Sequence, residues 1–116
     1  MKKFTIYHNP RCSKSRETLA ILEEKKVSPT IVEYLKKPLS KQEIKVLLGR
    51  LELSPIEMMR TKEKCFSELG LTKTSSDATL INAMAENPVL IERPIVSDGK
   101  NAVIGRPPEN VLKLLK

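Results

Sequence analysis

The sequence has few of the features that mark nucleic-acid-binding, membrane or secreted proteins. Aromatic residues make up 3% of its 116 residues, so it offers no aromatic stacking platform for single-stranded nucleic acid. No run approaches the ~18 consecutive apolar residues of a membrane helix, and we expect neither a membrane span nor a signal peptide. The two cysteines do not suggest a disulfide scaffold, and a chain without an export signal is expected to be cytoplasmic.

Common cofactor-binding patterns are also missing. One histidine and two well-separated cysteines give no ligand pairs at the spacing of a zinc site, so we expect no bound metal. The four glycines form neither a Walker motif nor a dinucleotide fingerprint, so we expect no bound cofactor of that kind. The formal charge of +7 would suit nucleic acid, but the basic residues are scattered and no zinc-finger or homeodomain pattern is present. We therefore expect no nucleic-acid partner, and the charge favours capture of a small anion.

The most informative stretch spans residues 8–16, with the sequence His-Asn-Pro-Arg-Cys-Ser-Lys-Ser-Arg. An apolar run at residues 4–7 precedes it and a helical pattern follows it. A strand should therefore end near His8 and a helix should begin near Ser13. Cys12 would then lie at a helix N-terminus, where unpaired amides and the helix dipole favour an anion.

Cations are concentrated around this cysteine. Arg11 and Lys14 flank Cys12 in the sequence, and one helical turn should bring Arg16 back towards it. Such surroundings lower the pKa of a thiol, so we predict a reactive thiolate. The alternative is a small buried structural cysteine, which the charged and hydroxyl-bearing neighbours disfavour.

A partner thiol is not close in the sequence. A dithiol site would have a cysteine three residues after Cys12, where the chain has Ser15. Cys65 lies beside Phe66 and Leu69 in a helical pattern and is interpreted as core packing. If Cys12 cycles through a disulfide, the resolving thiol should come from another molecule.

The order of predicted elements indicates an α/β protein. The first helix should end near residue 26, and the β-branched stretch at 30–34 is typical of a strand that pairs in parallel with the first. Residues 40–87 have a helical pattern, which a capping box of Ser40 and Glu43 opens. Strands are then expected at residues 89–91, 94–96 and 102–104, and residues 105–109 should open a last helix with proline in its first turn.

This order, β-α-β, a helical insertion and then β-β-α, matches the thioredoxin fold with its mixed four-stranded sheet. We predict a single domain over residues 1–116, with the helical insertion at about 40–87. Cys12 should then lie at the carboxyl end of a strand, where open α/β sheets place their sites.

Taken together, these residues resemble the glutaredoxin-linked arsenate reductases. The His-Asn-Pro-x-Cys-x-x-Ser-Arg pattern at residues 8–16 is similar to the active-site signature of that family. The resemblance continues through Arg60 after two methionines, through Glu-Arg-Pro-Ile-Val at 92–96 and through Ile-Gly-Arg-Pro-Pro at 104–108. It covers essentially the whole chain in family order.

The resemblance implies an arsenate reductase with the thioredoxin fold. It implies that Cys12 is the nucleophile and forms an adduct with arsenate. It also implies that Arg60, Arg93 and Arg106 bind the oxyanion and its arsenite product, and that Pro94 is cis beside the site. Glutathione and glutaredoxin would donate the electrons, so neither flavin nor metal is needed.

Supporting roles are expected for His8, Asn9, Ser15, Arg16 and Pro94. His8 would either tune the thiol or cap the strand. Asn9 and Ser15 are expected to hydrogen-bond the loop of Cys12 in a structural role.

Two alternatives remain beside the arsenate reductase interpretation. A transcription regulator similar to the Spx group would share the fold and bind RNA polymerase. The chain could also be a glutathione-dependent thiol reductase with another substrate. A phosphatase-type arsenate reductase is excluded, because its Cys-x5-Arg loop would need arginine at position 18, where the chain has Thr18.

Overall fold

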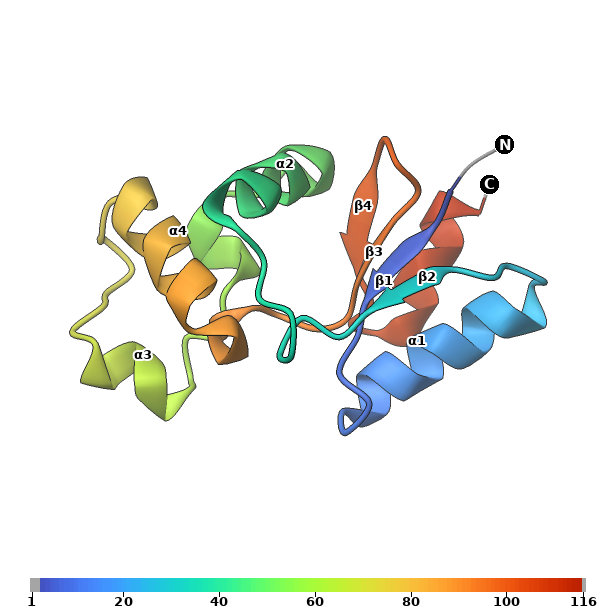
Figure 1. Ribbon diagram of the computed structural model, residues 1–116, viewed down its shortest axis with the longest axis horizontal. Helices are drawn as coiled ribbons and strands as arrows, with labels where there is room; N and C mark the ends of the chain where they lie inside the picture. Colours follow the sequence, from blue (N-terminus) through green and yellow to red (C-terminus); the bar gives the residue numbers. More distant parts are fainter. Residues whose placement is uncertain (1–2, 116) are drawn as a thin grey trace. The chain divides into compact units, whose positions relative to one another are not determined.

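One of two compact units of the chain is built on a four-stranded mixed sheet (Figure 1). The computed structural model describes residues 3–115, of which this unit holds 3–37 and 93–115. Its strands are β1 (Thr5–Tyr7), β2 (Thr30–Val32), β3 (Ile95–Ser97) and β4 (Ala102–Ile104), in the order β2-β1-β3-β4. β1 pairs in parallel with β2, while β1 with β3 and β3 with β4 are antiparallel. The predicted thioredoxin-like fold is confirmed.

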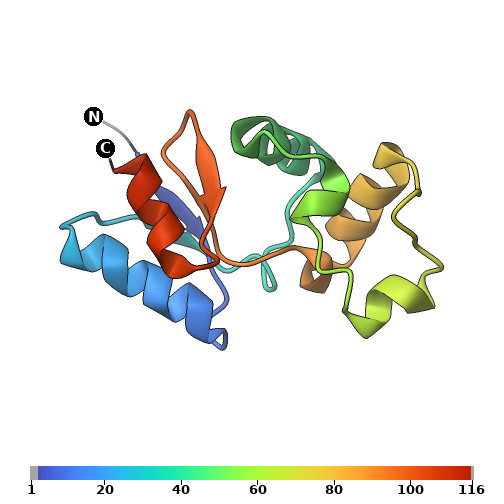
Figure 2. The ribbon, with the colours of Figure 1, turned by 180° about the vertical axis from the view of Figure 1, so that it is seen from behind.

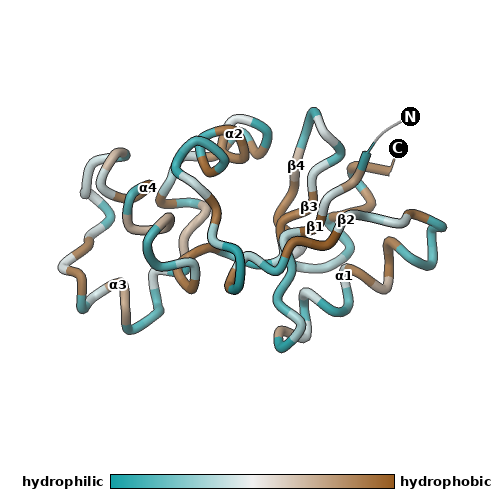
Figure 3. The backbone as a smooth tube through the Cα atoms, viewed as in Figure 1, coloured by the Kyte–Doolittle hydropathy of each residue, from teal (hydrophilic) through white to brown (hydrophobic). Residues whose placement is uncertain are grey.

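Two helices cover one face of this sheet. They are α1 (Ser13–Glu24) and the 3-10 helix η3 (Pro108–Leu114), which pack side by side (Figure 2). The core between helices and sheet consists of Ile6, Leu22, Val96, Val111 and Leu114. β1 contributes Ile6 and β3 contributes Val96 to this core, and Figure 3 shows that the strands are rich in hydrophobic residues. Because α1 follows β1 directly, its N-terminus lies at the carboxyl end of a central strand.

The second unit, Pro38–Glu92, contains short helices. They are α2 (Lys41–Leu51), η1 (Pro55–Met58), α3 (Lys64–Glu68), α4 (Asp77–Glu86) and η2 (Pro88–Leu90). The predicted capping box of α2 is confirmed: Ser40 Oγ accepts the N–H of Glu43 at 3.1 Å, and Glu43 Oε1 accepts the N–H of Ser40 at 3.1 Å. α2 packs against α4. Within residues 3–115, no helix combines the length and the apolar character that crossing a bilayer requires.

The strand predicted at residues 89–91 is wrong. Residues 88–90 form the 3-10 helix η2, in which the N–H of Leu90 donates to the carbonyl of Asn87 at 2.9 Å. Ile91 takes part in an isolated antiparallel bridge with Met59. A short apolar run does not distinguish a buried strand from a buried helical turn. Leu90 and Ile91 are fully buried, so burial explains their apolar character without a sheet.

Candidate functional site

Cys12 is the N-cap residue of α1 and directly follows the loop that leaves β1. Its backbone is extended, with φ −93° and ψ 123°, and its carbonyl accepts the N–H of Arg16 at 3.0 Å. Its own N–H donates to the carbonyl of Asn9 at 3.0 Å and closes the loop. The helix start predicted near Ser13 is confirmed. The half-buried thiol therefore lies beside the unpaired amides of the first helical turn.

The thiol of Cys12 is surrounded by hydrogen-bond donors. Burial by itself raises the pKa of Cys12, but a hydrogen bond from the Arg93 side chain opposes it. The pKa of Cys12 is lowered further by the backbone N–H groups of Ser15 and Lys14, and then by the positive charge of Arg93. Together these contacts hold the pKa of Cys12 below its ordinary value. The site therefore makes ionisation of the sulfur easier than in an ordinary thiol, and the ionised sulfur is the nucleophilic form.

The groups that lower the pKa of Cys12 are not the ones that the sequence predicted. The adjacent cations were expected to act on Cys12, yet the guanidinium of Arg16 donates to the carbonyl of Pro10 at 2.9 Å. The ammonium of Lys14 lies 3.7 Å from the Glu17 carboxylate, and Lys14 contributes its backbone N–H to the thiol instead. The cation that contacts Cys12 comes from residue 93, which is distant in the sequence.

A buried polar network holds the loop next to Cys12. The Ser15 hydroxyl lies 2.7 Å from Nδ1 of His8 and accepts the N–H of Asn9 at 3.0 Å. Burial lowers the pKa of His8, and although Glu33 raises that pKa and Arg16 lowers it, the net direction is downward. The imidazole is therefore neutral at neutral pH. Because Ser15 also donates its backbone N–H to the thiol, the network positions one of the donors to Cys12.

Arg93 and Arg106 meet at the start of β3 and the end of β4. The Arg93–Pro94 peptide bond is cis, which confirms the expectation for Pro94. Burial lowers the pKa of Arg93, but contacts with Cys12 and with the buried Tyr34 outweigh it and raise that pKa. The exposed Arg106 donates from Nη1 to the carbonyl of Arg93 at 3.4 Å. Within residues 3–115, the buried Nε of Arg93 has no hydrogen-bond acceptor.

Gly105 is a site-forming residue that sequence reasoning missed. A Cβ at position 105 would lie 2.5 Å from Oγ1 of Thr18 and 2.9 Å from Cγ of Pro94. Its N–H donates to the carbonyl of Pro94 at 2.9 Å. Glycine therefore lets the end of β4 approach α1 and the cis-proline loop closely. The available signal was a glycine immediately before Arg106 at the end of an apolar strand.

Arg60 and Cys65 belong to the second unit. The Arg60 guanidinium pairs with Glu63 at 2.9 Å and with Glu92 at 3.6 Å, which holds it in place within that unit. Its predicted role in oxyanion binding stays a prediction. Cys65 is a half-buried free thiol on α3, next to the buried Phe66. Residues 3–115 contain no group of three or more His, Cys, Asp or Glu side chains arranged to hold a metal ion.

The sheet topology and the thiol at the N-terminus of α1 define a thioredoxin-like protein with a one-cysteine site. The chain belongs to the ArsC family, whose model matches residues 7–114. It is 49% identical to the arsenate reductase of Haemophilus influenzae, over 95% of this chain and 97% of that protein. It is 50% identical to Escherichia coli YfgD over 98% of each chain. The solved arsenate reductase from Vibrio cholerae is 49% identical, with a TM-score of 0.92 over 97% of each chain.

Proposed function

We propose that this protein reduces arsenate to arsenite, with Cys12 as the nucleophile and glutathione and glutaredoxin as electron donors. The observation that carries the proposal is the position of the Cys12 thiol at the N-terminus of α1, where the Arg93 side chain and the backbone N–H groups of Ser15 and Lys14 donate hydrogen bonds to it. These donors lower the pKa of Cys12. Family membership and relatives named arsenate reductase support the substrate. A glutathione-dependent reaction fits the reducing cytoplasm as the place of action.

The oxyanion would bind beside Cys12 through the donors that converge there. Arg93 has a buried Nε that needs an acceptor, and planar guanidinium groups suit the oxygens of a tetrahedral oxyanion. Arg106 lies next to Arg93 and would add a second guanidinium. Arg60 is proposed as a third ligand on the basis of the family resemblance. These positive charges would offset the repulsion between a thiolate and an anionic substrate.

The two electrons for the reduction then come from two external thiols, one of glutathione and one of glutaredoxin. The Cys12 thiolate attacks arsenic, a sulfur–arsenic bond forms and one oxygen leaves as water after protonation. A glutathione thiolate next attacks the Cys12 sulfur, so a disulfide forms and the electron pair of the sulfur–arsenic bond passes to arsenic. Arsenic(V) becomes arsenic(III) and arsenite departs. Glutaredoxin cleaves the mixed disulfide by thiol exchange and restores the Cys12 thiolate.

A coupled assay tests this proposal. Arsenate-dependent NADPH consumption is followed with glutathione, glutaredoxin and glutathione reductase for the wild type, Cys12→Ser and Cys65→Ser. We expect Cys12→Ser to reduce turnover to background and the matched control Cys65→Ser to retain most of it. Equal losses in both variants would identify Cys65 as a resolving thiol. Absence of arsenate-dependent turnover in the folded wild type would refute the proposed function.

A further inference from the structure

A pocket of about 250 Å³ adjoins the loop that carries Cys12, within the unit that holds the sheet. Its lining comes from the loop after β1, residues 8–11, and from the turn after β2, where Glu33, Leu35 and Lys36 contribute. The turn is fixed by the carbonyl of Glu33, which accepts the N–H groups of Lys36 and Lys37 at 2.9 and 3.0 Å. The pocket does not overlap with Arg93 or Arg106, the proposed ligands of the oxyanion.

The charges of this pocket specify the chemistry of a ligand. Arg11 and Lys36 are exposed cations, and Glu33 is a carboxylate whose Oε1 lies 3.4 Å from Nζ of Lys36. Leu35 adds an apolar side chain that is 44% exposed. A small molecule with two carboxylates and one ammonium group would match two cations and one anion. The volume is just below the roughly 300–1,000 Å³ of typical small-molecule sites, so a short peptide fits better than a larger cofactor.

The position of the pocket relative to Cys12 suits a thiol peptide. Asn9 lines the pocket, and its carbonyl accepts the Cys12 N–H at 3.0 Å. Arg11 precedes Cys12, and adjacent Cα atoms are about 3.8 Å apart. A tripeptide spans about 10 Å when extended. A tripeptide anchored in the pocket by its charged ends could therefore bring a thiol on its middle residue to the Cys12 sulfur.

We propose that this pocket is the glutathione subsite, in which Arg11 and Lys36 bind the two carboxylates and Glu33 binds the ammonium group. The inference rests on the proposed function, because it assigns a place to the thiol that attacks the Cys12 sulfur. Recognition by exposed charges implies modest affinity that falls as ionic strength rises.

A binding experiment tests the location without requiring catalysis. S-methylglutathione, which cannot form a disulfide, is titrated into 15N-labelled protein, and amide shifts are followed by NMR. We expect shifts at residues 9, 11 and 33–36, and a Kd that is roughly tenfold higher in an Arg11→Gln, Lys36→Gln double variant. Lys36→Arg should retain most of the binding of the wild type.

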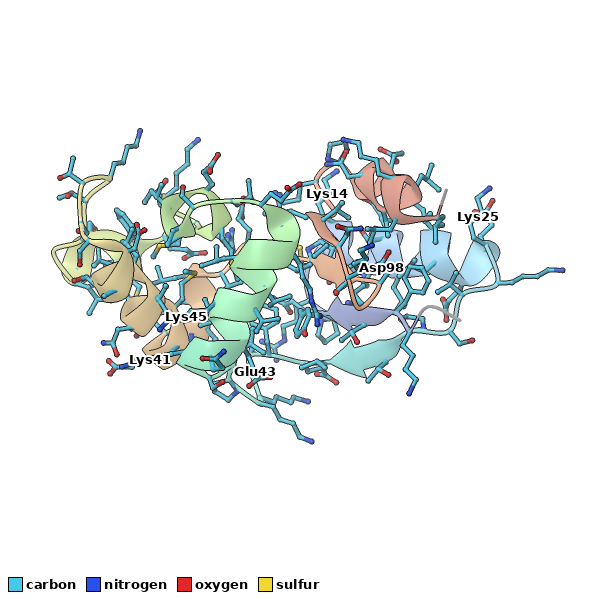
Figure 4. All side chains as sticks on the ribbon, turned by 90° about the horizontal axis from the view of Figure 1, so that it is seen from above. Lys14, Lys25, Lys41, Glu43, Lys45 and Asp98 are labelled. Carbon is cyan, nitrogen blue, oxygen red and sulfur yellow. The ribbon has the colours of Figure 1, made fainter. Side chains whose placement is uncertain are left out.

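Lys25→Gln controls for the removal of a positive charge outside the pocket. Lys25 is the C-cap residue of α1 and therefore lies at the opposite end of the helix from Cys12, the N-cap residue. Figure 4 labels Lys25 at that end and Lys14 in the first turn, near Cys12. The control should bind S-methylglutathione as the wild type does. Shifts confined to residues outside the pocket, an unchanged Kd in the double variant, or equal weakening by Lys25→Gln would each overturn the subsite.

Steady-state kinetics separates this inference from the proposed function. In the double variant, the KM for glutathione should rise roughly tenfold, while the KM for arsenate and kcat at saturating glutathione stay within about twofold of the wild type. An unchanged KM for glutathione, or a rise in the KM for arsenate alone, would overturn the subsite and leave the reductase function intact. If the wild type reduces no arsenate, the function fails, and the NMR titration still decides whether the pocket binds glutathione.

Discussion

Replacing Arg93 with alanine tests the origin of the Cys12 thiolate. Arg93 supplies both the leading hydrogen bond and the positive charge that lower the pKa of Cys12. The backbone N–H groups of Ser15 and Lys14 remain in the variant, so the effect should be partial. A hydrogen bond to a charged group contributes roughly 1.5–3 kcal/mol. Because the thiol is only half-buried, solvent screening reduces this to about 1 kcal/mol.

A loss of about 1 kcal/mol lowers the thiolate-to-thiol ratio about fivefold. The pKa of Cys12 should therefore rise in Arg93→Ala. The assay is the rate of alkylation of Cys12 by iodoacetamide as a function of pH. It is measured in a Cys65→Ser background, so that Cys12 is the thiol whose reaction is followed. At a pH below the pKa of Cys12, the variant should react about fivefold more slowly, because the rate follows the thiolate fraction. At high pH the two rates should converge, since both thiols are then ionised.

Arg106→Ala is the matched control. The Arg106 guanidinium donates to the carbonyl of Arg93 and not to the thiol, so its removal should change the alkylation profile much less. Arg93→Lys keeps the charge and loses the planar donor fork, and should fall between the wild type and Arg93→Ala. Thermal melts of each variant show whether the fold is retained. A rate ratio that is constant at all pH values, or a larger effect of Arg106→Ala, would refute the assignment of Arg93.

Two further predictions concern stability. Burial lowers the pKa of His8 in the folded protein below its value of about 6.5 in the unfolded chain. The neutral imidazole therefore contributes to the stability of the fold above about pH 6.5, and this contribution is lost as the pH falls towards the folded pKa. The melting temperature should therefore decrease between pH 7.5 and 5.5 more steeply in the wild type than in His8→Asn, and equal slopes would contradict the role of His8. Gly105→Ala should destabilise the fold by roughly 1–3 kcal/mol in urea unfolding, because its Cβ meets Thr18 and Pro94. Adding Thr18→Ala should recover part of the loss, and strictly additive losses would exclude this contact.

The sequence predicted correctly those elements whose ends depend on residues close together in the chain. The capping box of Ser40 and Glu43 placed the start of α2, and the apolar run before residue 8 placed β1. The same reasoning failed at residues 89–91, because three apolar residues are compatible with either a strand or a buried 3-10 turn. Pro88 begins that turn, and the carbonyl of Leu90 accepts the N–H of Arg60 at 2.7 Å. That pairing joins residues thirty positions apart, so no local pattern announces it.

The sequence by itself determined that Cys12 would cap a helix after a strand, because both signals lie within one short stretch and depend on backbone propensities. It also determined that no second thiol stands three residues beyond Cys12. Only the tertiary structure decided which cation contacts the sulfur. The nearby Arg16 binds the carbonyl of Pro10, and the distant Arg93 is brought to Cys12 by the antiparallel pairing of β1 with β3. Side-chain direction depends on packing and strand register, which sequence proximity does not specify.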